Sequence, residues 1–276
     1  MATTLVVHPA RRGLQWLRDG LWLFGRQPLA LVGLPAFFMM ALLLVSVVPV
    51  FGLWIGYMAL PLLGQAFVQA AYLVREGVRV PLSALWAPLR DAARRTELVR
   101  MMLIYAAGQI LLTWVAQWVD NGAVDQVRAV MLDDNSTEIQ LQQAMSNPDL
   151  FWGMATQMSL WTIWATIFWF VPALILWQRQ TVAQGVFSNL IGLWRNKVPL
   201  TLYLLAYGLL AVGLALAVQL LALLAGGVNL LVFLALILSL PMTAVFYLGL
   251  GAMYRDCFVV RAAPIPLPDT DPENTP

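Results

Sequence analysis

The sequence predicts an all-α integral membrane protein: a six-transmembrane-helix bundle with two or three amphipathic interfacial helices on the cytoplasmic side. Of its 276 residues, 61% are apolar and only 11% are charged, whereas about 25% of the residues in soluble domains are charged. So few charges cannot cover a surface that faces water. The composition therefore excludes a soluble enzyme and a disordered protein, and the net charge of +2 indicates no nucleic-acid partner.

The spacing of charged residues locates the spans. A membrane helix needs about 20 mostly apolar residues to cross about 30 Å of hydrocarbon. Two of the uncharged runs are long enough for two crossings each, and Pro49, Gly52, Gly226 and Gly227 supply the turns within them. Helices are favoured over a barrel because the runs are continuously apolar. The predicted spans are 29–50, 53–74, 98–119, 150–177, 200–224 and 229–254.

The spans form a single polytopic membrane domain over residues 1–262. The 120–149 segment is predicted as a periplasmic loop with one short helix around Val127 and a second that begins at a capping box of Asn135 and Glu138. Residues 263–276 hold five prolines and three acids, which predicts a disordered cytoplasmic tail. No cleaved signal is expected, because Arg18 and Asp19 interrupt the apolar region that one would need.

Basic residues predict the orientation. With six spans, both termini and two loops lie on one side of the membrane, and that side holds 15 of the 16 basic residues. The other side has Arg128 alone, beside several acidic residues. Because basic loops stay in the cytoplasm, both termini are predicted to be cytoplasmic. The basic residues are almost all arginine, which suggests a bacterial genome rich in G and C, and hence the bacterial inner membrane.

Two segments have the pattern of helices that lie in the membrane interface. Residues 11–26 repeat leucine or phenylalanine at helical spacing between arginines, and 182–197 repeat the design with Val182, Leu190 and Leu193. A third, poorer version starts at Leu82. Such helices either bind lipid or a partner, or simply orient the neighbouring hairpins. The candidate contacts to anionic lipid are Arg11, Arg12, Arg18, Arg26, Arg195 and Lys197.

Several short motifs in the first third of the chain resemble a known group of proteins. They are the run Gly-Leu-Gln-Trp-Leu from Gly13, Leu-Phe-Gly-Arg-Gln-Pro-Leu at 23–29, Pro49, Gly52, Pro61, Arg75-Glu-Gly77, Pro81 and Leu85. Over roughly residues 11–90 the chain resembles an uncharacterised family of proteobacterial multi-span inner-membrane proteins. The resemblance implies an inner-membrane location and several helices, but it brings no catalytic residues and no agreed activity.

The sequence offers no groups for catalysis. The apolar runs contain no Asp, Glu, Lys, Arg or His, the residues that usually mark ion paths and reaction centres inside membranes. His8 is the only histidine and Cys257 the only cysteine, so no histidine or cysteine cluster for a metal is possible. Nucleotide-binding and nucleophile motifs are missing as well. We therefore expect no enzyme, no cofactor, no metal and no catalytic residue.

Uncharged polar residues form a candidate seam between the third and fourth spans. Because these spans run antiparallel, side chains of one reach the depth of those of the other. The seam is either interhelical hydrogen bonding, worth about 0.6–2 kcal/mol per contact, or a polar path or ligand groove. Its members are Gln109, Thr113, Gln117, Gln157, Ser159, Thr162 and Thr166.

The sequence thus favours a non-enzymatic inner-membrane protein that binds a membrane-protein partner or organises lipid, besides its contact with the lipid bilayer. A homo-oligomer is also possible, and the Gly-x-x-x-Gly motif at Gly52 and Gly56 is weak support for it. The alternative function is a permease for an uncharged or lipid-like small solute, which would use the polar seam.

Overall fold

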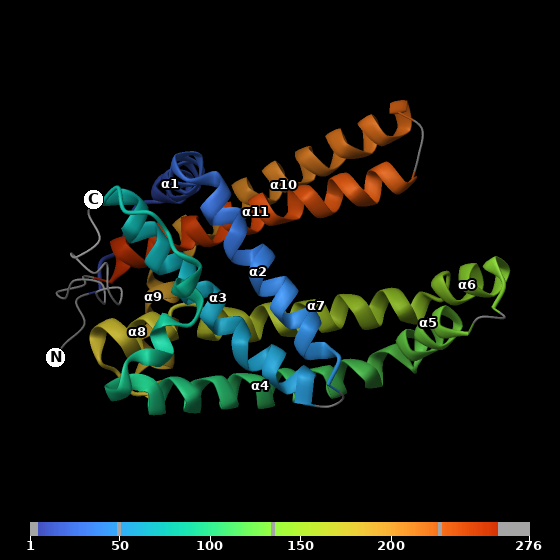
Figure 1. The fold of residues 1–276 in the computed structure, drawn as a ribbon, viewed down its shortest axis with the longest axis horizontal. Coiled ribbons are helices and arrows are strands. Elements are labelled where there is room, and N and C mark those ends of the chain that lie inside the picture. Colours follow the sequence, from blue (N-terminus) through green and yellow to red (C-terminus); the bar gives the residue numbers. More distant parts are fainter. Residues whose placement is uncertain (1–4, 49–50, 134–135, 226–227, 259–276) are drawn as a thin grey trace, which may run out of the picture.

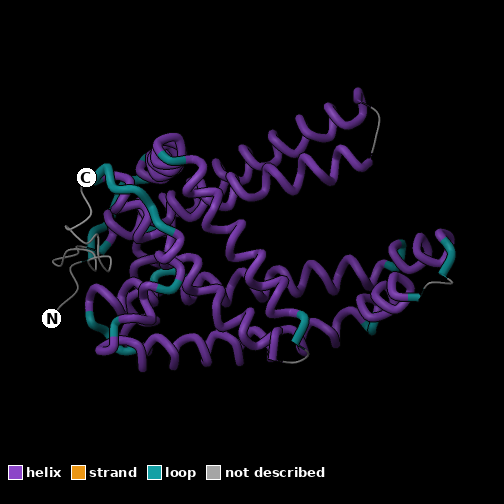
Figure 2. The backbone as a smooth tube through the Cα atoms, viewed as in Figure 1, coloured by secondary structure: helices purple, strands orange, loops and turns teal. Residues whose placement is uncertain are grey.

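A computed structural model shows an all-helical chain, and it describes residues 5–48, 51–133, 136–225 and 228–258 (Figure 1). Side chains are described in the same ranges except at 225 and 228–232. Among these residues the single β-type contact is an isolated bridge between Leu5 and Phe258, and loops are short (Figure 2). Six helices are long and apolar enough to cross a membrane, which confirms the predicted helical membrane architecture.

The six candidate spans lie close to the predicted ranges, with one of them divided between two helices, α7 and α8. In chain order the elements are α1 Arg12–Arg26, α2 Pro28–Ser46, α3 Phe51–Arg75, the 3-10 turns η1 Leu82–Leu85 and η2 Ala87–Arg90, α4 Ala92–Asp120, α5 Ala123–Leu132, α6 Glu138–Met145, α7 Pro148–Phe168, α8 Val171–Gln178, α9 Val182–Arg195, α10 Lys197–Ala225 and α11 Val228–Cys257. The spans are α2, α3, α4, α7 with α8, α10 and α11.

The hairpins are joined at one end of the molecule and diverge toward the other (Figure 1). The short helices α1, α8 and α9 gather at the joined end. From there the hairpin of α4 and α7 and the hairpin of α10 and α11 extend in different directions, and α2 with α3 crosses between them. Helices α5 and α6 lie at the far end of the α4 and α7 hairpin, where α5 packs on both α6 and α7.

Helix α1 is wedged against α10 and α11 rather than lying apart from the bundle. Its buried face consists of Gly13, Trp16, Gly20 and Leu23. A Cβ on Gly20 would lie only 2.7 Å from the Val245 carbonyl oxygen, so the two backbones touch. Of the stripe predicted from the sequence, Leu14 and Leu21 are exposed on a neighbouring face. Helix α1 therefore has one face toward protein and an apolar face left open.

A polar cluster closes this contact. Asp256 Oδ2 accepts hydrogen bonds from Arg12 Nε at 2.6 Å and from Trp16 Nε1 at 2.9 Å. The bond to Asp256 raises the pKa of the Arg12 guanidinium, which stays charged. Nearby, Asn196 accepts from the backbone N–H of His8 at 2.9 Å. The N-terminal segment, the start of α10 and the end of α11 are thus joined by hydrogen bonds.

The predicted fourth span is broken in the part nearer the joined end. Pro172 lacks an N–H to continue the helix, and α7 ends at Phe168 while α8 begins at Val171. The fully buried Asn189 of α9 compensates: its Nδ2 donates to the carbonyl oxygens of Thr166 and Ile167 at 3.0 and 2.8 Å, and its Oδ1 accepts from the Phe170 N–H at 3.3 Å. In an apolar setting such freed backbone groups need a side-chain partner.

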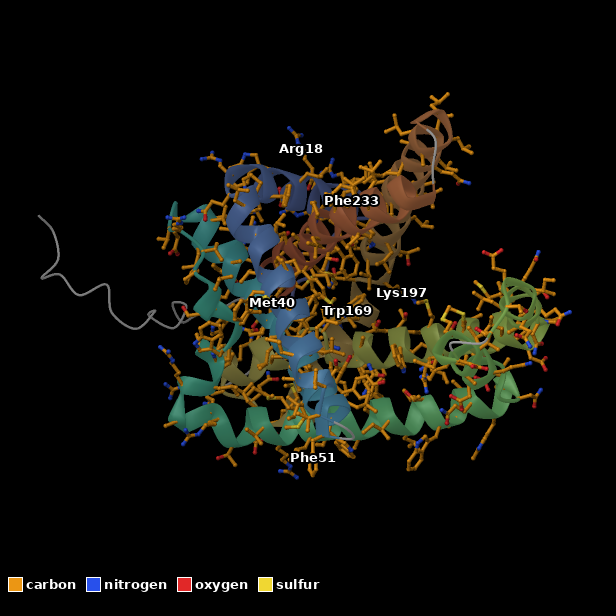
Figure 3. All side chains as sticks on the ribbon, turned by 45° about the vertical axis from the view of Figure 1, so that its right-hand side comes forward. Arg18, Met40, Phe51, Trp169, Lys197 and Phe233 are labelled. Atoms are coloured by element: carbon orange, nitrogen blue, oxygen red, sulfur yellow. The ribbon has the colours of Figure 1, made fainter. Side chains whose placement is uncertain are left out.

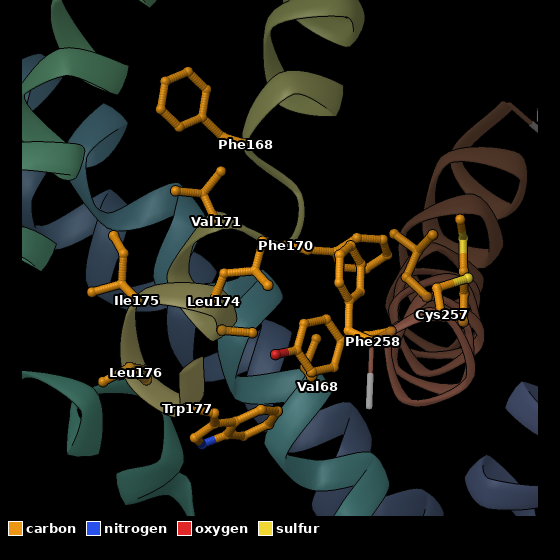
Figure 4. Close-up of a cluster of buried hydrophobic side chains, with 14 of the residues drawn as sticks. Val68, Phe168, Phe170, Val171, Leu174, Ile175, Leu176, Trp177, Cys257 and Phe258 are labelled. Atoms are coloured by element: carbon orange, nitrogen blue, oxygen red, sulfur yellow. The ribbon is translucent and has the colours of Figure 1, made fainter. Parts of the chain in front are cut away.

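Helix α8 follows the break and is enclosed by apolar neighbours. Phe170, Leu174 and Trp177 are buried and belong to the hydrophobic cluster that also contains Val68 of α3 and Phe258 (Figure 4). The aromatic rings are in contact, with the centroids of Phe170 and Phe258 5.8 Å apart. This cluster supplies the apolar core of the joined end.

Some sequence predictions differ from the structure in detail. The third amphipathic helix is replaced by η1 and η2, because Pro88 cannot donate a helical hydrogen bond. Helix α6 is capped by Thr137 with Gln140, whereas the predicted capping residue, Asn135, lies outside the described residues. Gly52 packs against α2 of the same chain, which accounts for the Gly-x-x-x-Gly motif without a second copy. The tail at 263–276 also lies outside the described residues.

We expect Asp256→Ala to lower the free energy of unfolding by about 2 kcal/mol, because Arg12 and the buried Trp16 indole lose their acceptor. Asp19→Asn is the matched control. The Asp19 carboxylate lies 3.7 Å from Arg12 and 3.4 Å from Arg75, so its loss costs less than about 1 kcal/mol. Denaturant titration in detergent micelles measures both changes. Equal losses for the two variants would contradict the role assigned to Asp256.

Candidate functional site

Close packing holds α4 and α7 together along most of their length. At Gly108 of α4 there is no room for a side chain, because the Trp164 ring of α7 lies directly against it. The indole Nε1 of Trp164 donates to the Tyr105 carbonyl oxygen at 3.0 Å. Toward the far end, Gly153 of α7 packs against Asp120. Two glycines therefore allow the antiparallel contact that the seam prediction assumed.

The hydroxyls of the predicted seam do not join the two helices. Thr113 donates to the Gln109 carbonyl oxygen at 2.8 Å, and Ser159, Thr162 and Thr166 each donate at 2.7 Å to the carbonyl oxygen four residues earlier. Each hydroxyl is thus satisfied within its own helix. The α4–α7 hydrogen bond in the described structure is made by Trp164 instead.

The glutamines of the seam have different surroundings. Gln109 is 2% exposed, and its Nε2 donates to the Tyr105 hydroxyl at 3.0 Å. Its Oε1 is buried without a hydrogen-bond partner. Gln117 is exposed and Gln157 is half-buried, and no hydrogen bond joins them within the described part of the chain. Only the inner part of the predicted seam is therefore enclosed.

Gln109 and Thr162 line a cavity of about 260 Å³ where α3, α4, α7 and α11 meet, here called the central cavity. Most of its wall is aromatic or aliphatic. Trp169, which belongs to this wall, lies near the middle of the molecule (Figure 3). The side chains that line the central cavity include Pro61, Tyr105, Gln109, Trp161, Thr162, Phe168, Trp169 and Tyr247. The structure thus brings two predicted seam residues, the buried Gln109 and the exposed Thr162, to the wall of one cavity.

A second concave surface of about 490 Å³, the α10–α11 groove, lies between the last two helices. Its wall is apolar except for Gln219 of α10 and Ser239 of α11, and both residues are exposed. Ala211 and Ala215 form the wall next to Gln219. The sequence analysis overlooked Gln219. It is the one glutamine of its long apolar run, and this isolation is the signal that was available.

Helix α10 has small and large residues on different faces. Gly208, Ala211, Ala215 and Gln219 recur every three or four residues and so share one face of α10, and the last three of them line the groove. No atom lies within 4 Å of a Cβ placed on Gly208. Large exposed leucines occupy another face, at Leu209, Leu216 and Leu220. The groove side of the helix is therefore both shallow and unoccupied.

The candidate anionic-lipid contacts are mostly free to act as such. Arg11, Arg18, Arg26, Arg195 and Lys197 are exposed, and the charges of Arg26 and Lys197 lie over the rings of Trp22 and Trp194, at 4.6 and 4.1 Å from the centroids. Arg12 is the exception, because it is bound to Asp256. Sequence reasoning did not identify the structural roles of Asp256, Asn189 or Asn196.

Arg195 also lines a surface pocket of about 430 Å³ at the corner between α8 and α9, together with Arg179, Gln184 and Ser188. The side chains that form this pocket include no acid. Phe187 lines it as well and is exposed. Basic and apolar groups therefore meet at this corner.

Comparison with known proteins identifies one similar sequence. The chain is 29% identical over 274 residues to a protein of Burkholderia thailandensis named "Probable inner membrane protein", and the alignment covers 96% of this chain and 98% of that one. No protein-family model matches the chain, and no solved structure matches it. The match confirms the resemblance to inner-membrane proteins and extends it beyond 11–90. With six helices long and apolar enough to cross a membrane, the structure fits an integral membrane protein.

Proposed function

We propose that this protein is a non-enzymatic inner-membrane component that binds another membrane protein through the α10–α11 groove. Two features of α10 together carry the proposal. The helix lines an open groove with small residues, and few residues of its span are buried by other helices. In the candidate span of α10 only 6% of the residues are buried, compared with 50% for α3. Helix α10 packs on α1, α9 and α11, so most of its length is open to other molecules.

The composition of the groove face supports a helix as the occupant. Transmembrane helices associate through small residues that let the backbones approach, and through polar side chains that hydrogen-bond across the contact. Gly208, Ala211 and Ala215 supply the first, and Gln219 and Ser239 supply the second. A purely lipid-facing surface has no need for either. A glycine inside a helix costs about 1 kcal/mol relative to alanine, and packing of a partner against Gly208 would offset this cost.

The chemistry of both sites supports binding over catalysis. The polar groups that line the central cavity and the α10–α11 groove are amides, hydroxyls and two indoles. Such groups bind by packing and hydrogen bonding, and carry no charge that could act as acid or base near neutral pH. We therefore propose a non-enzymatic role because the polar groups that line both sites are uncharged.

We also infer that the joined end of the bundle is cytoplasmic. Most arginines belong to that end, through α1, the turns before α4, and α9. The backbone N–H of Val6 donates to the Cys257 carbonyl oxygen at 3.1 Å, so the first and last described residues meet there. An even number of spans and the preference of basic segments for the cytoplasm support this orientation.

Thiol labelling of intact cells with an impermeant maleimide tests the orientation. We expect Gln126→Cys, in α5, to react, and Ala92→Cys, at the start of α4, to react only after the membrane is permeabilised. Both positions are exposed. The native Cys257 is buried, so the unmodified chain serves as a low background. The reverse pattern of labelling would refute a cytoplasmic joined end.

Photo-crosslinking in native membranes tests the partner. A photoreactive phenylalanine analogue at Ala215, in the groove, is expected to form a protein–protein adduct. The same analogue at Leu220 is the matched control, because that side chain is exposed on a different face of α10. In the Ala215 variant, adding Gln219→Leu is expected to reduce the adduct about threefold or more, because one interhelical hydrogen bond is lost.

The adduct mass identifies the partner. An adduct of twice 30.6 kDa indicates a second copy, and any other mass indicates a different protein. Equal protein adducts from Ala215 and Leu220, or lipid adducts alone at both, would overturn the proposal that the groove binds a protein.

The central cavity supports a permease as the second candidate, because Gln109 and Thr162 of the predicted seam both line it. In that case purified protein in proteoliposomes carries a neutral solute such as glycerol without any partner. Gln109→Leu would then slow transport while the protein remains folded by size-exclusion chromatography. Glycerol flux equal to that of empty liposomes is the expected result if the groove, and not the cavity, carries the function.

A further inference from the structure

Two polar atoms of the central cavity have no partner. Gln109 Oε1, an acceptor, and Trp161 Nε1, a donor, are buried, and the described structure offers neither a hydrogen bond. Both residues line the same cavity. Gln109 is held in place because its Nε2 donates to the Tyr105 hydroxyl at 3.0 Å. One unpaired acceptor and one unpaired donor therefore belong to two residues that line the same, largely aromatic cavity.

An unpaired polar atom is costly at this position. Gln109 and Trp161 lie near the middle of their candidate spans, far from the water on either side of a membrane. Burying an amide or indole N–H without a hydrogen bond is unfavourable in apolar surroundings. A cavity of about 260 Å³ has room for a ligand group or for water molecules. The site therefore favours an occupant that satisfies both atoms.

We propose that the central cavity binds the hydroxyl end of a neutral, long-chain amphiphile, a lipid alcohol. A hydroxyl group donates one hydrogen bond and accepts others, so a hydroxyl placed between Gln109 Oε1 and Trp161 Nε1 would satisfy both atoms. The ligand is neutral because none of the lining side chains is charged, and an unpaired ion is far more costly in such a place than a hydroxyl. This inference is independent of the partner at the α10–α11 groove.

The size and position of the cavity fit one end of such a molecule. Sites that enclose a whole drug-sized ligand measure about 300–1,000 Å³, so this cavity holds only the head group and the first part of a chain. Thr162 lines the cavity and is exposed at the surface of α7. The cavity thus opens beside Thr162, where the remaining hydrocarbon chain lies among the lipids.

The aromatic wall suits the part of the chain next to the hydroxyl. Phe168, Trp169 and Tyr247 give apolar surface, and Pro61 and Gly64 of α3 line the same wall. The Tyr247 ring lies 3.5 Å from the position of a Cβ on Gly64. The wall therefore offers apolar contacts to the short segment of the ligand chain next to the hydroxyl, and Gln109 and Trp161 belong to the same wall.

Photolabelling of the full chain in phosphatidylcholine nanodiscs tests the site. The probe is hexadecanol with a diazirine near its hydroxyl. We expect adducts on peptides of α4 and α7 that contain Gln109 or Trp161. Unlabelled hexadecanol is expected to compete about tenfold better than hexadecyl methyl ether, which accepts hydrogen bonds but cannot donate to Gln109 Oε1. This comparison needs no variant of the protein.

Variants then assign the two contacts. Gln109→Leu and Trp161→Phe each remove one partner, and each is expected to weaken probe binding about tenfold. Gln117→Leu is the matched control, because Gln117 is exposed on the same helix, and it should leave labelling unchanged. Size-exclusion chromatography confirms that each variant is folded.

Three results would overturn the inference. Equal competition by the alcohol and the ether would mean that the cavity takes up any apolar chain. Labelling that persists undiminished in folded Gln109→Leu and Trp161→Phe would place the hydroxyl elsewhere. No adduct at all on α4 and α7 would mean that water alone fills the cavity. Each of these outcomes leaves the crosslinking result at Ala215 unaffected, so the two proposals fail separately.

Discussion

The contact of α1 with α10 and α11 is the constraint on which the arrangement of the hairpins depends. Gly13 and Gly20 let the backbones touch, and the Asp256 carboxylate accepts from both Arg12 and the buried Trp16 indole. Charge-assisted hydrogen bonds of this kind are about twice as strong as neutral ones. They lie at one end of the molecule, where they join α1 to the end of α11, and α11 also packs on α2 and α3.

The divergence of the hairpins follows from this one-ended attachment. Helix α10 packs on α1, α9 and its hairpin partner α11. Most of its candidate span is not buried. A bundle packed along its whole length would have covered the face of Gly208, Ala215 and Gln219. The α10–α11 groove is therefore a consequence of where the stabilising contacts lie.

Some polar groups within the spans have a hydrogen-bond partner in the same chain, and others have none. At the break between α7 and α8, Asn189 satisfies three backbone groups, and the seam hydroxyls are satisfied within their own helices. Gln109 Oε1 and Trp161 Nε1 are left without partners, and Gln219 is exposed on a nearly bare helix. Natural proteins pair most buried polar groups, and the buried pair at the central cavity and the exposed Gln219 are the features on which the two proposed binding sites rest.

The sequence by itself determined the helical class, the six candidate spans and the resemblance to inner-membrane proteins, because span length and apolar composition are local properties that a bilayer imposes directly. It also placed Gln109 and Thr162 among the candidate residues. Only the tertiary structure showed that Gln109 is enclosed while Gln117 is exposed, and that Arg12 is bound to Asp256, 244 residues away. Such pairings depend on how the helices cross, and helix crossings are set by close packing between distant segments, which periodicity along one helix does not specify.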